Sequence, residues 1–171
     1  AMTVENTARD TPLIGPDDPE PFELLNPESE LPVLLICDHA SKTVPQEMAN
    51  LGLDEATMDL HVGWDIGAAE VVRQLANDLN CMAVLAGYSR LVIDNNRQPG
   101  DPTGIPAVSD DIVIPGNQDL TETEQIARTD QFFWPYHHAI TDGIAHLWRN
   151  GLPPAVFSVH TFTPSMNGED R

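Results

Sequence analysis

The chain has 171 residues, the size of one domain and enough to bury a core of its own. It carries 27 Asp and Glu against 8 Lys and Arg, and a formal net charge of -19 argues against nucleic acid and anionic membranes as partners. The sequence shows no apolar stretch long enough to cross a bilayer and no signal peptide, so we expect a cytoplasmic protein. Its cysteines, Cys37 and Cys81, are expected to be buried free thiols.

The N-terminal segment differs from the rest of the chain. Residues 1–31 are acidic and rich in proline, without a sustained hydrophobic period, which predicts an extended acidic arm with one docked segment at Phe22–Leu25. Residues 32–171 are expected to form a single α/β domain.

Each of two short apolar runs is followed by a histidine. Residues 32–37 begin with proline and are too few for a typical helix, which predicts a strand buried on both faces in the middle of a parallel sheet. Asp38 and His39 follow this run, and residues 155–159 lead in the same way to His160. Ligands of open α/β sheets bind beyond the carboxyl ends of the strands, so the sequence predicts a metal site there.

The segment between these runs predicts both helices and strands. Residues 64–79 form the clearest helix, after two short helical pieces at 46–50 and 54–61, and one apolar face is expected to contain Ile66, Ala69, Val72, Leu75 and Leu79. Apolar runs predict further strands at 81–86 and 89–93, and the first of these completes a right-handed βαβ unit.

The second half of the chain predicts a long loop and a long helix. Residues 98–119 are rich in Pro, Gly, Asp and Thr, which is typical of a functional or disordered loop. Thr121 and Glu124 form a capping box that starts a helix running to about residue 148, and Pro135 should kink or divide it.

The candidate chemical groups are dispersed, because the sequence lacks H-E-x-x-H, C-x-x-C and P-loop motifs. Neutral imidazoles, such as those of His39 and His160, together with one carboxylate are the ligand set of a catalytic zinc ion. Such a metal polarises a carbonyl and lowers the pKa of its water to about 7. Arg90 or Arg97 would bind a substrate carboxylate through two parallel hydrogen bonds.

Each of these residues also has a structural interpretation, and the residues alone leave both open. A histidine after a strand is often a hydrogen-bonded structural residue, and Asp65 could favour a helix N-terminus through the helix dipole. Asp94 could belong to a turn, and Arg97 could pair with a surface carboxylate. The other histidines lie in helical stretches and are interpreted as structural or surface residues: His61, His137, His138 and His146.

Five sequence blocks in this order resemble the N-formylglutamate amidohydrolase family: LLICDHAS, WDIGAA, YSRLVIDNNR, IPGN and SVHTFTPSMNG. The resemblance implies a three-layer αβα fold with a mixed, largely parallel sheet, similar to the zinc carboxypeptidase-like folds. It also implies zinc-dependent hydrolysis of the amide bond of a small N-formyl or N-acyl amino acid, such as N-formylglutamate. A homo-oligomer stays open.

The resemblance also implies roles for single residues. Carried over by motif, the zinc ligands would be His39 from CDHAS, Asp65 from WDIGA and His160 from VHTF. Asn96 and Arg97 resemble the Asn-Arg pair that holds the substrate carboxylate in zinc carboxypeptidases.

Further roles follow from nearness to these blocks. Arg90 and Asp38 are candidate catalytic residues, and Arg90 would contact the substrate carboxylate or the oxyanion. Asp94 and Ser41 are candidate substrate-binding residues. The glutamate that resembles the general base lies in a C-terminal part of the family pattern that this chain is expected to lack. Asp38, Asp94 and Glu169 are therefore the candidates for the base. The alternative function is a non-catalytic carboxylate-binding module, or an inactive truncated amidohydrolase.

Overall fold

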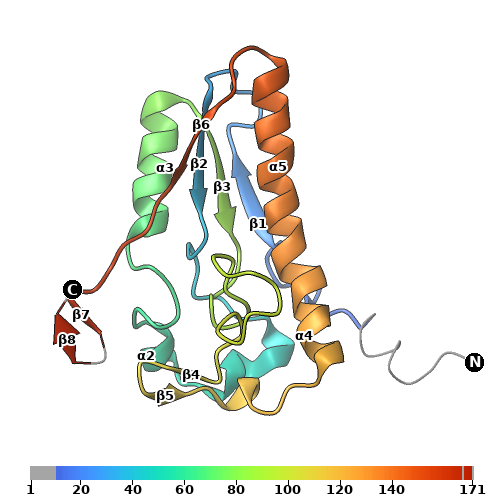
Figure 1. Cartoon of the computed structure of the whole chain (residues 1–171), viewed down its shortest axis with the longest axis vertical. Coiled ribbons are helices and arrows are strands. Elements are labelled where there is room, and N and C mark those ends of the chain that lie inside the picture. The colour runs from blue at the N-terminus through green and yellow to red at the C-terminus, as the bar shows by residue number, and fades with distance from the viewer. Residues whose placement is uncertain (1–10, 167, 171) are drawn as a thin grey trace, which may run out of the picture.

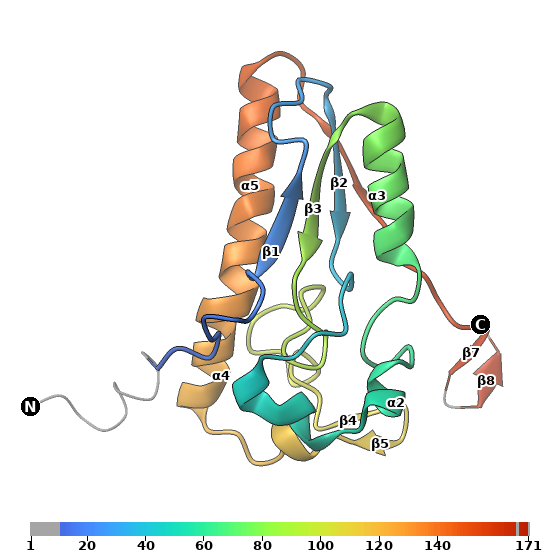
Figure 2. The ribbon, with the colours of Figure 1, turned by 180° about the vertical axis from the view of Figure 1, so that it is seen from behind.

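A mixed sheet lies between two helices in the computed structural model, which describes residues 11–166 and 168–170 (Figures 1 and 2). The sheet has four strands in the order β1-β3-β2-β6, where β1 is Phe22–Leu25, β2 is Val33–Cys37, β3 is Met82–Ala86 and β6 is Ala155–Ser158. β1 runs antiparallel to β3, while β3, β2 and β6 are parallel. The predicted α/β class with a mixed, largely parallel sheet is confirmed.

The side chains of the central strands alternate between two cores, because successive residues of a strand point to opposite faces. One core joins Leu35 and Leu85 to α3 (Ala68–Leu79). The other joins Leu34 and Val84 to α5 (Trp134–Arg149). α3 and α5 therefore cover opposite faces of the sheet, as Figure 1 shows, and the layers are those of an αβα arrangement.

The strand predicted at 32–37 is confirmed as β2, and its two neighbours β3 and β6 both run parallel to it. Three of its residues pair on both sides: Leu34 is opposite Met82 and Val156, Leu35 is opposite Ala83 and Phe157, and Ile36 is opposite Val84 and Ser158. Because β2 and β6 are adjacent and parallel, the residues that follow them emerge at the same edge of the sheet. Their two histidines are brought together in this way.

The helix predicted at 64–79 begins later, and its buried face only partly matches the predicted one. α3 starts at Ala68, after Gly67, whose φ of 82° is a left-handed conformation suited to glycine. Of the predicted apolar face, Val72 is fully buried and Ala69 packs against the same core, so the prediction is confirmed there. It is wrong for Ile66, Leu75 and Leu79, which are 51%, 37% and 51% exposed. Small side chains on the buried face let the helix approach the sheet closely, and a pattern of large apolar residues does not reveal this.

The strand predicted at 89–93 is wrong. The segment forms a turn in which the Val92 amide donates to the Ser89 carbonyl oxygen at 3.0 Å. Leu91 and Val92 are nevertheless 0% exposed, because they pack in a third cluster below the carboxyl ends of the strands. The apolar run correctly indicated burial but did not specify the backbone.

The long helix predicted from Thr121 is divided as expected. α4 (Glu122–Arg128) begins with the predicted capping box, and a π-helical turn, Thr129–Phe133, separates it from α5. Pro135 has no N–H and its ring displaces the carbonyl four residues earlier, so the wide turn before it relieves this conflict.

The remaining elements are short. The predicted docked segment Phe22–Leu25 is confirmed as the sheet strand β1, so part of the expected arm belongs to the sheet. The predicted loop 98–119 contains a hairpin of β4 (Val108–Ser109) and β5 (Ile112–Val113), followed by a 3₁₀ turn at Pro115–Asn117. Two short helices precede α3: a 3₁₀ helix at Gln46–Gly52 and α2 at Glu55–Met58. β7 (Ser165–Met166) and β8 (Glu169–Asp170) form a hairpin that stands apart from the sheet in Figure 1. Across the described residues, none of the helices has the length and apolar character needed to span a bilayer.

Candidate metal centre

Three side chains from separate parts of the chain converge at the carboxyl edge of the sheet. His39 follows β2 and His160 follows β6, where the Val159 amide donates to the Ile36 carbonyl oxygen at 2.9 Å and extends the strand pairing. Asp65 lies in the turn before α3, and its amide donates to the carbonyl oxygen of His39 at 3.0 Å. One potential ligand atom from each of His39, Asp65 and His160 lies within 4.8 Å of the other two.

The geometry of this group suits a divalent cation. Asp65 Oδ2 lies 2.9 Å from His160 Nδ1 and 3.3 Å from His39 Nδ1, and the two imidazole rings have centroids 5.1 Å apart. His39 and Asp65 are buried, and the side chain of His160 is 17% exposed. Two imidazole nitrogens and a carboxylate could hold a metal ion, and they match the protein ligands of catalytic zinc sites.

A carboxylate contacts the other nitrogen of each imidazole. His39 Nε2 lies 2.6 Å from Asp94 Oδ1, and His160 Nε2 lies 3.3 Å from Asp38 Oδ2 and 2.9 Å from Ser158 Oγ. A carboxylate on the outer nitrogen of a metal-binding histidine fixes the ring orientation and the tautomer. Both histidines therefore present Nδ1 toward Asp65.

Asp38 is held behind His160 by residues of the neighbouring elements. The Tyr136 hydroxyl donates to Asp38 Oδ1 at 2.7 Å, and the Ser158 hydroxyl donates to Oδ2 at 3.5 Å. Asp38 is 5% exposed, and it is absent from the described residues that line the cavity in front of the histidines. Its burial and its contacts are those expected of a carboxylate that orients the His160 ring.

The electrostatics of the group favour ionised carboxylates. Burial by itself would raise the pKa values of Asp65 and Asp94, but hydrogen bonds with His39 and the charge of Arg90 outweigh it and lower both pKa values. Burial opposes protonation of His39, whereas its hydrogen bonds with Asp65 and Asp94 raise its pKa overall. The negative charge that a bound cation would require is therefore retained.

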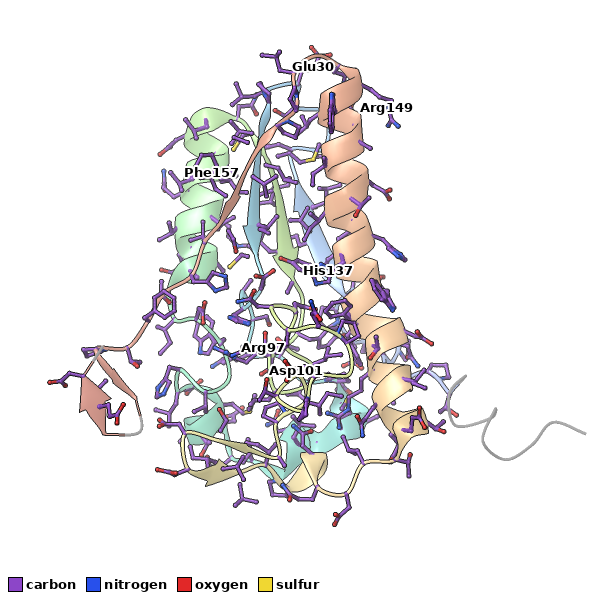
Figure 3. The ribbon with its side chains drawn as sticks, viewed as in Figure 1. Glu30, Arg97, Asp101, His137, Arg149 and Phe157 are labelled. Carbon is purple, nitrogen blue, oxygen red and sulfur yellow. The ribbon has the colours of Figure 1, made fainter. Side chains whose placement is uncertain are left out.

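A cavity of about 270 Å³ opens in front of this group, and both predicted substrate-binding arginines line it. Arg90 lies 3.2 Å from Asp94 Oδ2 and 3.6 Å from Asp65 Oδ1, and Arg97 Nε lies 4.0 Å from Asp94 Oδ2. Figure 3 labels Arg97 in the loop beyond the carboxyl ends of the strands. Asn96 also lines the cavity, and its backbone amide donates to Asp94 Oδ1 at 2.9 Å.

Two predicted residues lie elsewhere. Ser41 lines a different cavity, of about 460 Å³, beside β1 and α3, and its hydroxyl oxygen accepts a hydrogen bond from the Thr43 amide. Glu169 is exposed in β8, within the hairpin that stands apart in Figure 1.

His61, interpreted from the sequence as structural, lines the cavity with the candidate ligands. Its Nε2 lies 2.9 Å from Asp110 Oδ2, at the tip of the β4–β5 hairpin, and Ser109 of the same hairpin also lines the cavity. The one signal in the sequence was its position four residues before Asp65, in HVGWD.

Fold and site together define an α/β protein with a candidate metal centre at the carboxyl edge of parallel strands. A family model described as N-formylglutamate amidohydrolase matches residues 31–171, and the chain belongs to this family, as the five sequence blocks predicted. The crystal structure of gene product Atu2144 from Agrobacterium tumefaciens is similar, with 36% sequence identity and a TM-score of 0.89. The match covers 94% of this chain and 64% of that chain, so this chain spans less than two thirds of the relative's length. The search of curated proteins finds no match.

Proposed function

We propose that the protein hydrolyses the amide bond of a small N-formyl or N-acyl amino acid, such as N-formylglutamate, with zinc held by His39, Asp65 and His160. The observation that carries this proposal is the convergence of these three side chains on a cavity that two arginines also line. Membership of an amidohydrolase family supports the reaction type. When bound, zinc would supply Lewis acidity and a water with a pKa near 7.

The surrounding carboxylates position the ligands in this proposal. Asp94 contacts His39 Nε2 with one oxygen and Arg90 with the other, so it aligns a candidate ligand and a substrate-binding group together. Asp38 orients His160 from behind. Both carboxylates are occupied by these contacts, so we assign them positioning roles and leave the general base without a residue.

The cavity residues bind and orient the substrate. Arg97 and Asn96 hold the substrate carboxylate, which places the amide bond in front of the histidines. Arg90 faces Asp65 and stabilises the negative charge that develops on the carbonyl oxygen during attack. His61, whose Nε2 lies 2.9 Å from Asp110 Oδ2, lines the same cavity and contacts the substrate there.

The experiment combines metal analysis with turnover. We expect about one zinc per chain and release of formate from N-formyl-L-glutamate by the wild type. Both should be lost in His39→Ala and kept in the control His138→Ala, because His138 is exposed on α5. No turnover by the wild type, or undiminished turnover by His39→Ala, would contradict the proposal.

A carboxylate-binding module is the second candidate, because Arg90 and Arg97 line the cavity with or without a metal. It predicts binding of N-formyl amino acids without turnover, and a loss of that binding in Arg97→Ala. Isothermal titration calorimetry beside the turnover assay separates the two candidates.

A further inference from the structure

A second cavity, of about 390 Å³, lies next to the candidate metal centre, between the loop at 97–105 and the α4 side of the molecule. Arg97 lines both cavities, and Asp94 lines the second one. Arg97 Nε lies 4.0 Å from Asp94 Oδ2, and Asp94 Oδ1 lies 2.6 Å from His39 Nε2. A small molecule whose carboxylate is held by Arg97 can therefore extend into this second cavity.

The walls of this cavity are mainly apolar. Ile93 and Phe133 are each 5% exposed, Ile105 and Ile126 are partly buried, and Trp134 is 40% exposed at the rim. The rings of Phe133 and Trp134 meet edge to face, with centroids 5.0 Å apart. Phe133 ends the π-helical turn, and such turns recur at functional sites. We call the space bounded by these five residues and Arg97 the side pocket.

The charges of the side pocket are mainly negative. Its acidic lining residues are Asp94, Asp101, Glu122 and Asp130, and Arg97 is the one cation among its described lining residues. Figure 3 labels Arg97 and Asp101 in the same loop. A substrate that uses Arg97 for its α-carboxylate would place any second carboxylate against these acidic side chains. Apolar groups meet no such repulsion, and the walls offer them surface to bury.

We infer that the side pocket binds the side chain of a large apolar amino acid, such as phenylalanine or leucine, in the N-acyl amino acid substrate. This inference rests on the proposed function, and it names a substrate class other than N-formylglutamate. One methylene in an apolar pocket changes specificity by about 10-fold to 200-fold. We therefore expect kcat/KM for N-formyl-L-phenylalanine and N-formyl-L-leucine to exceed that for N-formyl-L-glutamate by about tenfold or more.

The first test fills the pocket. Ile126→Trp should lower kcat/KM for N-formyl-L-phenylalanine about tenfold or more while leaving N-formylglycine within about twofold, because glycine has no side chain to enter. Circular dichroism of the variant checks that its fold is retained.

The second test removes a wall. Trp134→Ala should lower kcat/KM for N-formyl-L-phenylalanine about tenfold and leave N-formylglycine unchanged. The matched control is Trp148→Ala, because Trp148 is also on α5, is 59% exposed and lies outside the side pocket. The control should change neither substrate.

The outcomes separate this inference from the proposed function. If N-formyl-L-glutamate is the better substrate, or if a folded Ile126→Trp keeps the wild-type ratio of phenylalanine to glycine substrate, the inference is wrong and hydrolysis stands. If the wild type hydrolyses no N-formyl amino acid, the proposed function fails. Calorimetry with N-formyl-L-phenylalanine then decides: saturable binding that is lost in Ile126→Trp supports the side pocket, and no binding overturns it.

Discussion

The nitrogen of each imidazole that faces away from Asp65 meets a carboxylate, Asp94 for His39 and Asp38 for His160. The shorter of the two contacts, at 2.6 Å, joins Asp94 to a residue that is 3% exposed. In a setting so shielded from water, a charged partner has a larger influence on the imidazole than it would at the surface.

Asp94→Asn should weaken metal binding. The amide keeps the size of the side chain but removes the charge that faces His39 and Arg90, and changes of this kind in the partners of metal ligands cost about 10-fold to 100-fold in affinity. Competition with a zinc-binding dye measures the affinity. Asp142→Asn is the control, since Asp142 is exposed on α5. An unchanged affinity in Asp94→Asn would show that the contact does not support the metal.

His61→Asn should affect binding of the substrate more than the chemical step. The loss of one hydrogen bond to a charged substrate group raises KM about tenfold or more, while kcat and zinc content stay close to the wild type. Steady-state kinetics with metal analysis measures all three, and His138→Asn is the control. A fall in kcat at constant KM would instead place His61 in the chemical step.

α4 fixes the segment that carries the substrate-binding arginines. Arg128 is 5% exposed, and its guanidinium donates to Asn117 Oδ1 at 2.6 Å, to the Val92 carbonyl oxygen at 3.0 Å and to the Gly116 carbonyl oxygen at 3.1 Å. Burial lowers the pKa of Arg128 to about 10. The side-chain amide of Asn117 in turn donates to the Leu91 carbonyl oxygen at 2.8 Å. This network holds a buried turn that lacks the hydrogen bonds of a sheet.

Arg128→Met should destabilise the protein by about 3 kcal/mol, because two buried acceptors and one partly buried acceptor lose their donor. A chain of this length would then unfold about 6–12 °C lower. Urea unfolding and differential scanning calorimetry measure the change. Arg149→Met at the exposed end of α5 is the control and should change the free energy of unfolding by less than about 0.5 kcal/mol. An equally small effect in Arg128→Met would contradict the role of the network.

The elements that the sequence predicted best are those whose local pattern and tertiary setting agree. β2 and β3 are continuous apolar runs that are also buried between parallel or antiparallel neighbours. At residues 89–93 the apolar side chains of Leu91 to Ile93 are also buried, but the segment is not a strand. The Ser89 hydroxyl and carbonyl oxygens accept hydrogen bonds from the backbone amides of Leu91 and Val92 and hold a turn.

The candidate site was predictable to the extent that topology determines it. Two histidines that follow adjacent parallel strands must lie near one another, and this could be predicted from the apolar runs before them. Asp65 could be predicted as a ligand only from the family resemblance, because topology does not determine where a turn before a helix lies along the edge of a sheet. His61 depends on the β4–β5 hairpin, whose Asp110 meets it across 49 residues of chain, and nothing in its local sequence indicates that contact.

The molecule is strongly acidic, and its few basic residues lie in distinct settings. With a net charge of -19, the general field repels an anionic substrate, so local positive charge has to attract it. Arg90 and Arg97 line the cavity, while Arg73 is paired with Glu23 and Arg128 is buried. The positive charge is thus placed where the proposed substrate binds.

The stability of the whole molecule should fall above about pH 8.5, where an unfolded thiol begins to ionise. Burial raises the pKa of Cys37 to about 12, and burial with the charges of Asp18 and Glu20 raises the pKa of Tyr88 to about 12. The folded protein then keeps protons that the unfolded chain releases, so the free energy of unfolding decreases as pH rises.

Urea unfolding at pH 7.5, 8.5 and 9.5 measures this dependence. Cys37→Ala should reduce the slope between the two higher values, because one of the retained protons is gone. A slope that is the same in Cys37→Ala, or stability that rises over this interval in the wild type, would contradict the assignment.

The central claim is that His39, Asp65 and His160 bind one metal ion, and a crystal of the zinc-loaded protein tests it most directly. An anomalous difference map recorded on both sides of the zinc absorption edge should show a single strong peak about 2.0–2.2 Å from a nitrogen of each histidine and an oxygen of Asp65. A peak bound by other residues, or no peak between these three side chains, would contradict it.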